Sequence, residues 1–139
     1  MSENTARVQA LYDRLNRRDA TVMAELLHED LKDHTSHGET DGRAAHEQHV
    51  LASIEGFPDL RFEVSDLFGD GDKVVARGRL SGTNKGPFMG APPSGKAFSI
   101  AWIAIYHFRG DKVAERWLQG DDFGMMVQLG FVAPPGPPR

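Results

Sequence analysis

The apolar residues of this sequence change their spacing near residue 57, and this change restricts the folds open to the chain. Before it they recur at helical spacing, as Val8, Leu11 and Leu15 do on one face of an amphipathic helix. After it they alternate with polar residues, as in LRFEVS at 60–65, which is the pattern of a half-buried strand. Helices followed by a run of strands indicate an α+β domain with the helices on one face of an antiparallel sheet.

Three helices and four strands are expected from these patterns. Asp19 and Asp41 are of a type that caps helices, so the second and third helices are predicted to begin after them, and the proline of GFPD (56–59) ends the third. The polar stretch KDHTSHGETDG (32–42) is predicted to be a loop. The strands are predicted at 60–65, 73–83, 96–108 and 113–119. The third of these is apolar almost throughout, which predicts cover on both of its faces.

Length and composition exclude several classes of protein. The 139 residues fit a single domain, predicted at 1–131, with a proline-rich flexible tail at 132–139. A net charge of −4 with scattered Lys and Arg argues against a nucleic-acid partner. The absence of cysteine removes disulfides, thiolate nucleophiles and Cys-based zinc sites. The apolar run 97–108 is shorter than the roughly 20 residues of a membrane helix, and the polar N-terminus lacks a signal core, so a cytoplasmic protein without membrane contact is expected.

Four short motifs occur in a fixed order from residue 57 onward. They are FPDL (57–60), GTNKGPFMGAPPSGK (82–96), GDKVAERW (110–117) and D-x-x-G-x-x-x-Q-L-G (121–130). With these motifs, residues 5–131 resemble the SnoaL-like polyketide cyclases (ester cyclases) of the NTF2-like superfamily. The resemblance implies a cone-shaped α+β barrel, in which a curved antiparallel sheet and three N-terminal helices enclose a pocket. It also implies a homodimer or homotetramer packed through the sheet.

The resemblance further implies an intramolecular aldol condensation on a small hydrophobic, aromatic substrate, with no metal and no cofactor. The acid/base aspartate of the family follows a W-x-x-x-D pattern, which Trp117 and Asp121 match here. Burial against apolar groups would raise the pKa of such a carboxyl and make it a useful base. The residue type equally suits a turn or a helix cap. Asp122 fits neither motif spacing and is expected to be a solvated neighbour or a cap.

His107 is the second candidate catalytic residue, because cyclases of this group carry a polar pocket residue at this strand position. Its alternative is a surface histidine at a strand end. Alternation along the strand puts Ile105 and His107 on one face and Trp102 on the other. The candidate substrate-binding residues are His34, Tyr12, Phe88, Met89, Trp102, Ile105, Trp117 and Gln119.

Two histidine pairs, His34 with His37 and His46 with His49, have spacings that occur in metal sites. Zinc needs three or four convergent ligands, and the two pairs lie on different predicted elements, so no metal site is predicted. A fold of this type also serves isomerases, hydrolases and non-catalytic binders of small hydrophobic ligands. A proton-active carboxylate inside the pocket distinguishes an enzyme of the cyclase type from a binder.

Overall fold

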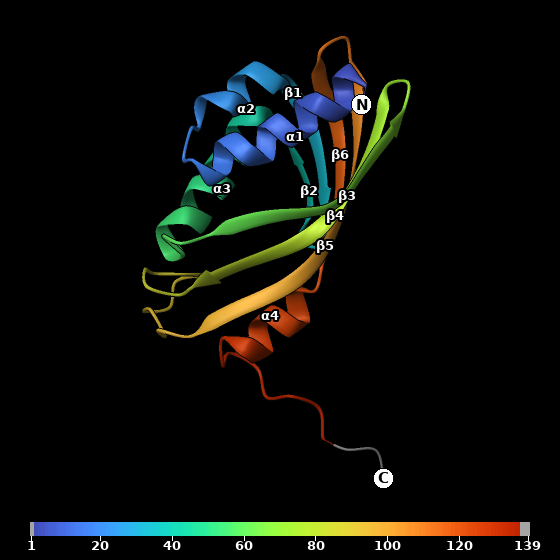
Figure 1. Cartoon of the computed structure of the whole chain (residues 1–139). Helices are drawn as coiled ribbons and strands as arrows, with labels where there is room; N and C mark the ends of the chain where they lie inside the picture. Colours follow the sequence, from blue (N-terminus) through green and yellow to red (C-terminus); the bar gives the residue numbers. More distant parts are fainter. Residues whose placement is uncertain (1, 137–139) are drawn as a thin grey trace.

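The computed structural model describes residues 2–136, and its helices and strands form one continuous arrangement around a curved sheet (Figure 1). The elements follow in the order α1 (Glu3–Asn16), α2 (Thr21–Leu26), β1 (Leu27–Thr35), β2 (Gly38–Asp41), α3 (Arg43–Gly56), β3 (Arg61–Asp70), β4 (Lys73–Thr83), β5 (Ala97–Arg109), β6 (Lys112–Gly120) and α4 (Asp122–Gln128). None of the described helices has the length and apolarity needed to span a bilayer. Residues 132–136 of the predicted tail lie outside helices and strands, and residues 137–139 lie outside the described residues.

The six strands pair in the order β2-β1-β6-β5-β4-β3. Neighbouring strands are antiparallel except β1 and β6, which run parallel. Helices α1, α2 and α3 lie on the concave side of the sheet (Figure 1). Helix α4 packs beside the first residues of β5, where Ser99 is hydrogen-bonded to Gln128. The predicted α+β architecture with a curved sheet is therefore confirmed. Two details differ from the prediction. The sheet is mixed rather than wholly antiparallel, and it stays open instead of closing into a barrel.

The predicted loop at 32–42 is wrong, because most of it belongs to the hairpin of β1 and β2. The inward side chains of β1 include Leu27, Leu31 and Asp33, all at most 4% exposed. A buried aspartate conceals the alternation that normally identifies a strand. The caps also differ, since α2 begins after Ala20, and α3 begins after Gly42, whose φ of 99° suits glycine.

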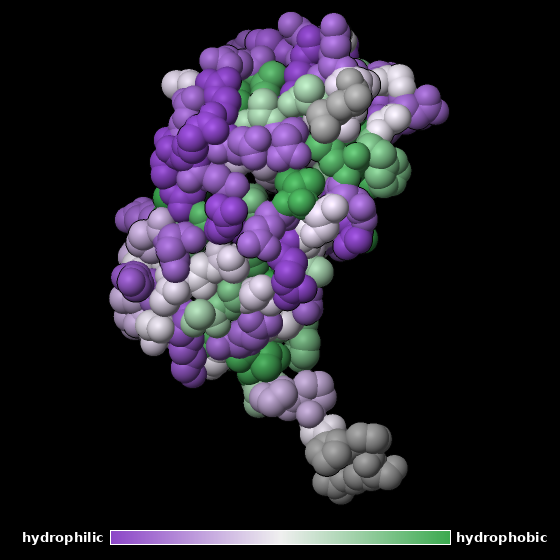
Figure 2. All heavy atoms as spheres, in the orientation of Figure 1, coloured by the Kyte–Doolittle hydropathy of each residue, from purple (hydrophilic) through white to green (hydrophobic). Residues whose placement is uncertain are grey.

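The inner face of β5 supplies much of the core. Residues at even positions are buried, including Trp102, Ala104 and Tyr106, and they pack against α1. The odd positions are not covered by this chain, since Ile103 is 53% exposed and Ile105 38%. The predicted cover on both faces of this strand is therefore absent within the described chain. Hydrophilic residues predominate over α1, α2 and α3, whereas hydrophobic residues show at the surface both on the upper right of the view and around α4 (Figure 2).

Candidate functional site

A cavity of about 300 Å³ lies between the concave face of the sheet and the helices. Its floor consists of inward side chains of β5 and β6, because residues two apart on a strand point to the same side. Most of its lining is apolar, which suits a flat hydrophobic ligand. The floor residues are Phe98, Ile100 and Trp102 on β5 and Arg116, Leu118 and Gly120 on β6.

Polar side chains gather at one end of the cavity, where the β1–β2 turn, α3 and α4 meet. We call this group the Asp122 cluster; it consists of Ser36, His37, His49 and Asp122. The hydroxyl of Ser36 donates to Oδ2 of Asp122, and Nε2 of His37 lies 3.7 Å from the same oxygen. The ring of His37 is 6.3 Å from that of His49. The cluster thus combines a carboxylate, a hydroxyl donor and two imidazoles beside an apolar space.

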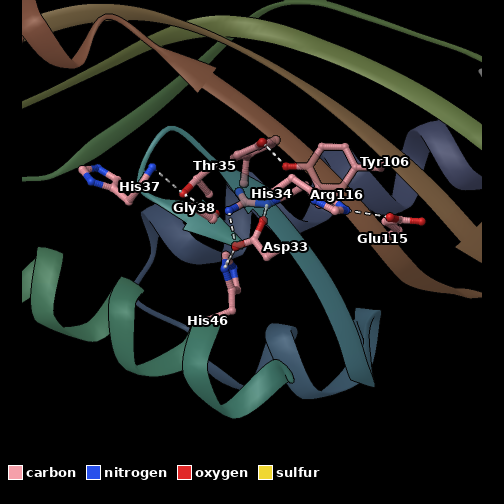
Figure 3. A network of polar contacts seen from close by, with 10 residues as sticks. Asp33, His34, Thr35, His37, Gly38, His46, Tyr106, Glu115 and Arg116 are labelled. Carbon is pink, nitrogen blue, oxygen red and sulfur yellow. Dashed lines mark hydrogen bonds and ion pairs between the residues drawn. The ribbon is translucent and has the colours of Figure 1, made fainter. Parts of the chain in front are cut away.

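A second polar group lies toward the other end of β6, around Asp33 and Arg116 (Figure 3). Arg116 donates to both oxygens of Asp33, with Nε–Oδ1 and Nη2–Oδ2 distances of 2.8 Å. Nδ1 of His46 lies 3.2 Å from Oδ2 of the same carboxylate. Behind Arg116, the hydroxyls of Tyr12 and Tyr106 are hydrogen-bonded to each other. Among these residues, Arg116 and Tyr12 line the cavity.

The charges of this inner group follow from its burial and its partners. Burial alone would raise the pKa of Asp33, but hydrogen bonds from His46 and Arg116 outweigh it and hold that pKa well below its usual range. Burial, aided by the charge of Arg116, lowers the pKa of His46, so its imidazole is neutral and donates through Nδ1. Burial also raises the pKa of Tyr12 and of Tyr106, so both phenols keep their hydrogens.

The two shifted histidines predict opposite effects of pH on stability. The lowered pKa of His46 means that the folded protein resists protonation there, whereas the unfolded chain takes up this proton below about pH 6.5. The contribution of His46 to the free energy of unfolding therefore falls as the pH drops, by at most about 1.4 kcal/mol per pH unit. Hydrogen bonds to Glu115 and Glu39 raise the pKa of His34, so its contribution is present at low pH and fades as the pH rises. We expect His46→Gln to flatten the rise of unfolding free energy with pH, and His34→Gln to steepen it. Denaturant unfolding between about pH 5.5 and pH 7.5 measures both slopes, and a change of the same sign in both variants would contradict these assignments.

The structure does not place Asp121 in the cavity. Its carboxylate caps α4 by accepting from the backbone N–H of Gly124 at 2.9 Å, and the residue is exposed. The next residue, Asp122, is the one that lines the cavity. The motif spacing identified Asp121 as the acid, whereas the direction in which the chain enters α4 turns the neighbouring carboxylate inward.

Five other predicted site residues lie away from the cavity lining, on the outer face of the sheet. There His34 stacks on Trp117 with ring centroids 5.0 Å apart, and His107 packs edge-on against Trp117 at 4.6 Å. Side chains alternate along a strand, so the pairing of Ile105 with Trp117 puts both opposite the cavity side. The outer residues are His34, Ile105, His107, Trp117 and Gln119, none of which lines the cavity.

Four of the predicted substrate-binding residues do line the cavity. Tyr12 comes from α1 and Trp102 from β5, while Phe88 and Met89 come from the loop after β4. The sequence analysis missed Arg116 and Ser36, and it considered Asp122 only as a cap or solvated neighbour and His37 and His49 only as metal ligands. Alternation along the strand could have identified Arg116, because successive side chains of a strand point to opposite faces and Arg116 precedes the outward Trp117. Within the described residues, no group of three His, Asp or Glu side chains is arranged to hold a metal ion.

The open, curved sheet with helices over an apolar cavity is an α+β fold of the NTF2-like type. The chain belongs to the SnoaL-like polyketide cyclase family, whose model matches residues 6–129. No curated protein sequence matches the chain significantly.

Solved structures of similar fold support this placement. AclR from Streptomyces galilaeus, described as a candidate hydroxylase, is 25% identical over 98% of this chain and 86% of its own, with a TM-score of 0.87. A candidate SnoaL-like polyketide cyclase from Jannaschia sp. CCS1 is 26% identical over 96% of this chain and 94% of its own, with a TM-score of 0.84. IdmH from Streptomyces antibioticus, a candidate polyketide cyclase, is 26% identical over 93% of this chain and 99% of its own, with a TM-score of 0.80.

Proposed function

We propose that the protein is a polyketide cyclase-like enzyme that uses its own side chains to remove a proton α to a carbonyl of a hydrophobic, aromatic substrate. The observation that carries the proposal is the position of Asp122. Among the described residues lining the cavity, it is the sole carboxylate, and it borders an apolar space. Its side chain is 40% exposed, at the edge of the cavity, where a carboxylate can reach the α-carbon of a ligand bound against the apolar lining.

The reaction then follows in two proton transfers around one new bond. Asp122 takes the α-proton, and the C–H electron pair becomes an enolate. The enolate carbon attacks a second carbonyl carbon of the same molecule, forming the C–C bond, and the resulting alkoxide takes the proton back from Asp122. Ser36, which already donates to Asp122, fixes the orientation of the carboxylate. The net change is an isomerisation, so no co-reactant is consumed.

If the cavity binds the substrate, a hydrophobic ketone should bind beside its lining residues. The chain has four isoleucines, and Ile100 lines the cavity, whereas Ile103 and Ile105 lie exposed on the outer face. We expect 2-acetonaphthone, a flat aromatic ketone, to shift the methyl NMR signal of Ile100 through its ring current. The signals of Ile103 and Ile105 should stay in place.

Methyl-labelled isoleucine and Ile→Val substitutions for assignment make this measurement direct. A shift confined to Ile103 and Ile105 would move the ligand site to the outer face, beside His107, and would overturn the proposal. Binding at Ile100 without any turnover would leave the protein as a carrier of hydrophobic ligands on the same fold.

A further inference from the structure

The inner end of the cavity has more hydrogen-bond donors than acceptors. Arg116 carries five N–H hydrogens, and its bonds to Asp33 use Nε and Nη2, which leaves Nη1 free of those bonds. Both oxygens of Asp33 are already occupied, Oδ1 by Arg116 and Oδ2 by Arg116 and His46. The carboxylate is therefore not exposed to the cavity as a free acceptor.

The paired phenols have one hydrogen more than they can use on each other. Two hydroxyls bring two hydrogens, and the bond between Tyr12 and Tyr106 consumes one of them. No other acceptor for either hydroxyl occurs among the hydrogen bonds of the described residues. The hydroxyl of Tyr106 is fully buried and also accepts from Arg116, while Tyr12 lines the cavity. The spare hydrogen reaches a ligand in the arrangement in which Tyr106 donates to Tyr12.

Trp102, beside Tyr12, carries a further N–H donor. Its ring lies 5.0 Å from that of Tyr12, it lines the cavity, and it is 5% exposed. Its indole nitrogen is buried without a hydrogen-bond partner among the described residues. A buried donor without a partner is costly, and such groups are usually explained by a missing polar partner.

The net charge of the inner group indicates which acceptor fits. The guanidinium of Arg116 is balanced by Asp33, and His46 and both phenols are neutral. A carboxylate ligand would lose its hydration in an apolar cavity without meeting an excess positive charge. A neutral ketone, ether or phenol oxygen accepts the spare hydrogens and loses less hydration.

We propose that the inner end of the cavity is a subsite for a neutral oxygen acceptor on the substrate, bound by Tyr12 and Arg116. Along β6 the backbones of Arg116 and Gly120 are separated by roughly 13 Å at the usual rise per residue, and Asp122 lies two residues beyond Gly120. Building on the proposed function, the substrate is an elongated aromatic molecule. It has its carbon acid at the Asp122 cluster and a second, neutral oxygen at the opposite end.

Three ligands of matched shape test the subsite. They are 6-methoxy-2-acetonaphthone, its 6-ethyl analogue, which replaces the ether oxygen by CH2, and its 6-carboxylate analogue. Affinity is read from quenching of Trp102 in a Trp117→Phe protein, in which Trp102 is the remaining tryptophan. We expect the methoxy ligand to bind about tenfold or more tightly than the ethyl ligand, and more tightly than the carboxylate.

Two variants assign the preference to the inner end. Tyr12→Phe should abolish most of the preference of methoxy over ethyl, because it removes the spare hydrogen and keeps the ring. Ser53→Ala, which changes a polar lining residue on α3, should retain the preference. Equal affinities for the methoxy and ethyl ligands, tightest binding of the carboxylate, or full retention of the preference by Tyr12→Phe would each overturn the subsite. The ratio is measured without turnover, so an inactive Asp122 would not change it.

Discussion

Replacing Arg116 by methionine is expected to lower the free energy of unfolding by about 3–5 kcal/mol, because it leaves the charge of Asp33 buried without its partner. Asp33 is 4% exposed, and its remaining contact is a neutral imidazole donor, His46. Denaturant titration at neutral pH measures the loss. The matched control is Arg77→Met, which breaks the pair with Asp66 on the outer face, where both side chains are more than half exposed. That control should lose no more than about 1 kcal/mol.

A double variant separates the loss of a charge from the loss of packing. In Arg116→Met combined with Asp33→Asn, no buried charge remains, and the oxygen of the introduced amide can still accept from His46. Much of the stability should return, since a buried ion pair replaced on both sides is often neutral in its effect. If the double variant were as unstable as Arg116→Met alone, the buried charge would not be the cause.

The elements with regular periods could be predicted from the sequence. The spacing of Val8, Leu11 and Leu15 gave α1, and the alternation of Phe62 and Val64 gave β3. The hairpin of β1 and β2 could not, because its inward side includes Asp33, a charged residue that is buried only because Arg116 and His46 bind it. Such partners come from elsewhere in the chain, and hydrophobic periodicity does not reveal them.

The prediction of the candidate site was limited because the sequence shows which residues are present but not the direction in which each side chain points. On β5 both faces are apolar, so the pattern does not tell that Trp102 points into the cavity and Ile105 away from it. At the start of α4, two consecutive aspartates differ by one position, and the capping bond to Gly124 turns Asp121 outward. A one-residue step at a helix start reverses which carboxylate faces the cavity, and motif spacing alone cannot resolve it.

Replacing Asp122 by asparagine is expected to lower the rate of proton abstraction by about 10²–10⁴-fold, because the amide keeps the size of the carboxylate but cannot accept the proton. Hydrophobic ligand binding should persist, since most of the lining is apolar. Asp121→Asn is a matched control one residue away. Asparagine caps a helix as well as aspartate does, so α4 should form normally and the rate should remain near that of the unaltered protein.

The measurement that tests this account most directly is the exchange of the methyl protons of 2-acetonaphthone for deuterium in D2O, followed by proton NMR. It needs no knowledge of the natural substrate, because removal of an α-proton is the step assigned to Asp122. The account predicts that the unaltered protein and Asp121→Asn accelerate exchange equally above buffer, and that Asp122→Asn returns it to the buffer rate. Full exchange by Asp122→Asn, with loss in Asp121→Asn, would contradict it, and so would the absence of any acceleration by the unaltered protein.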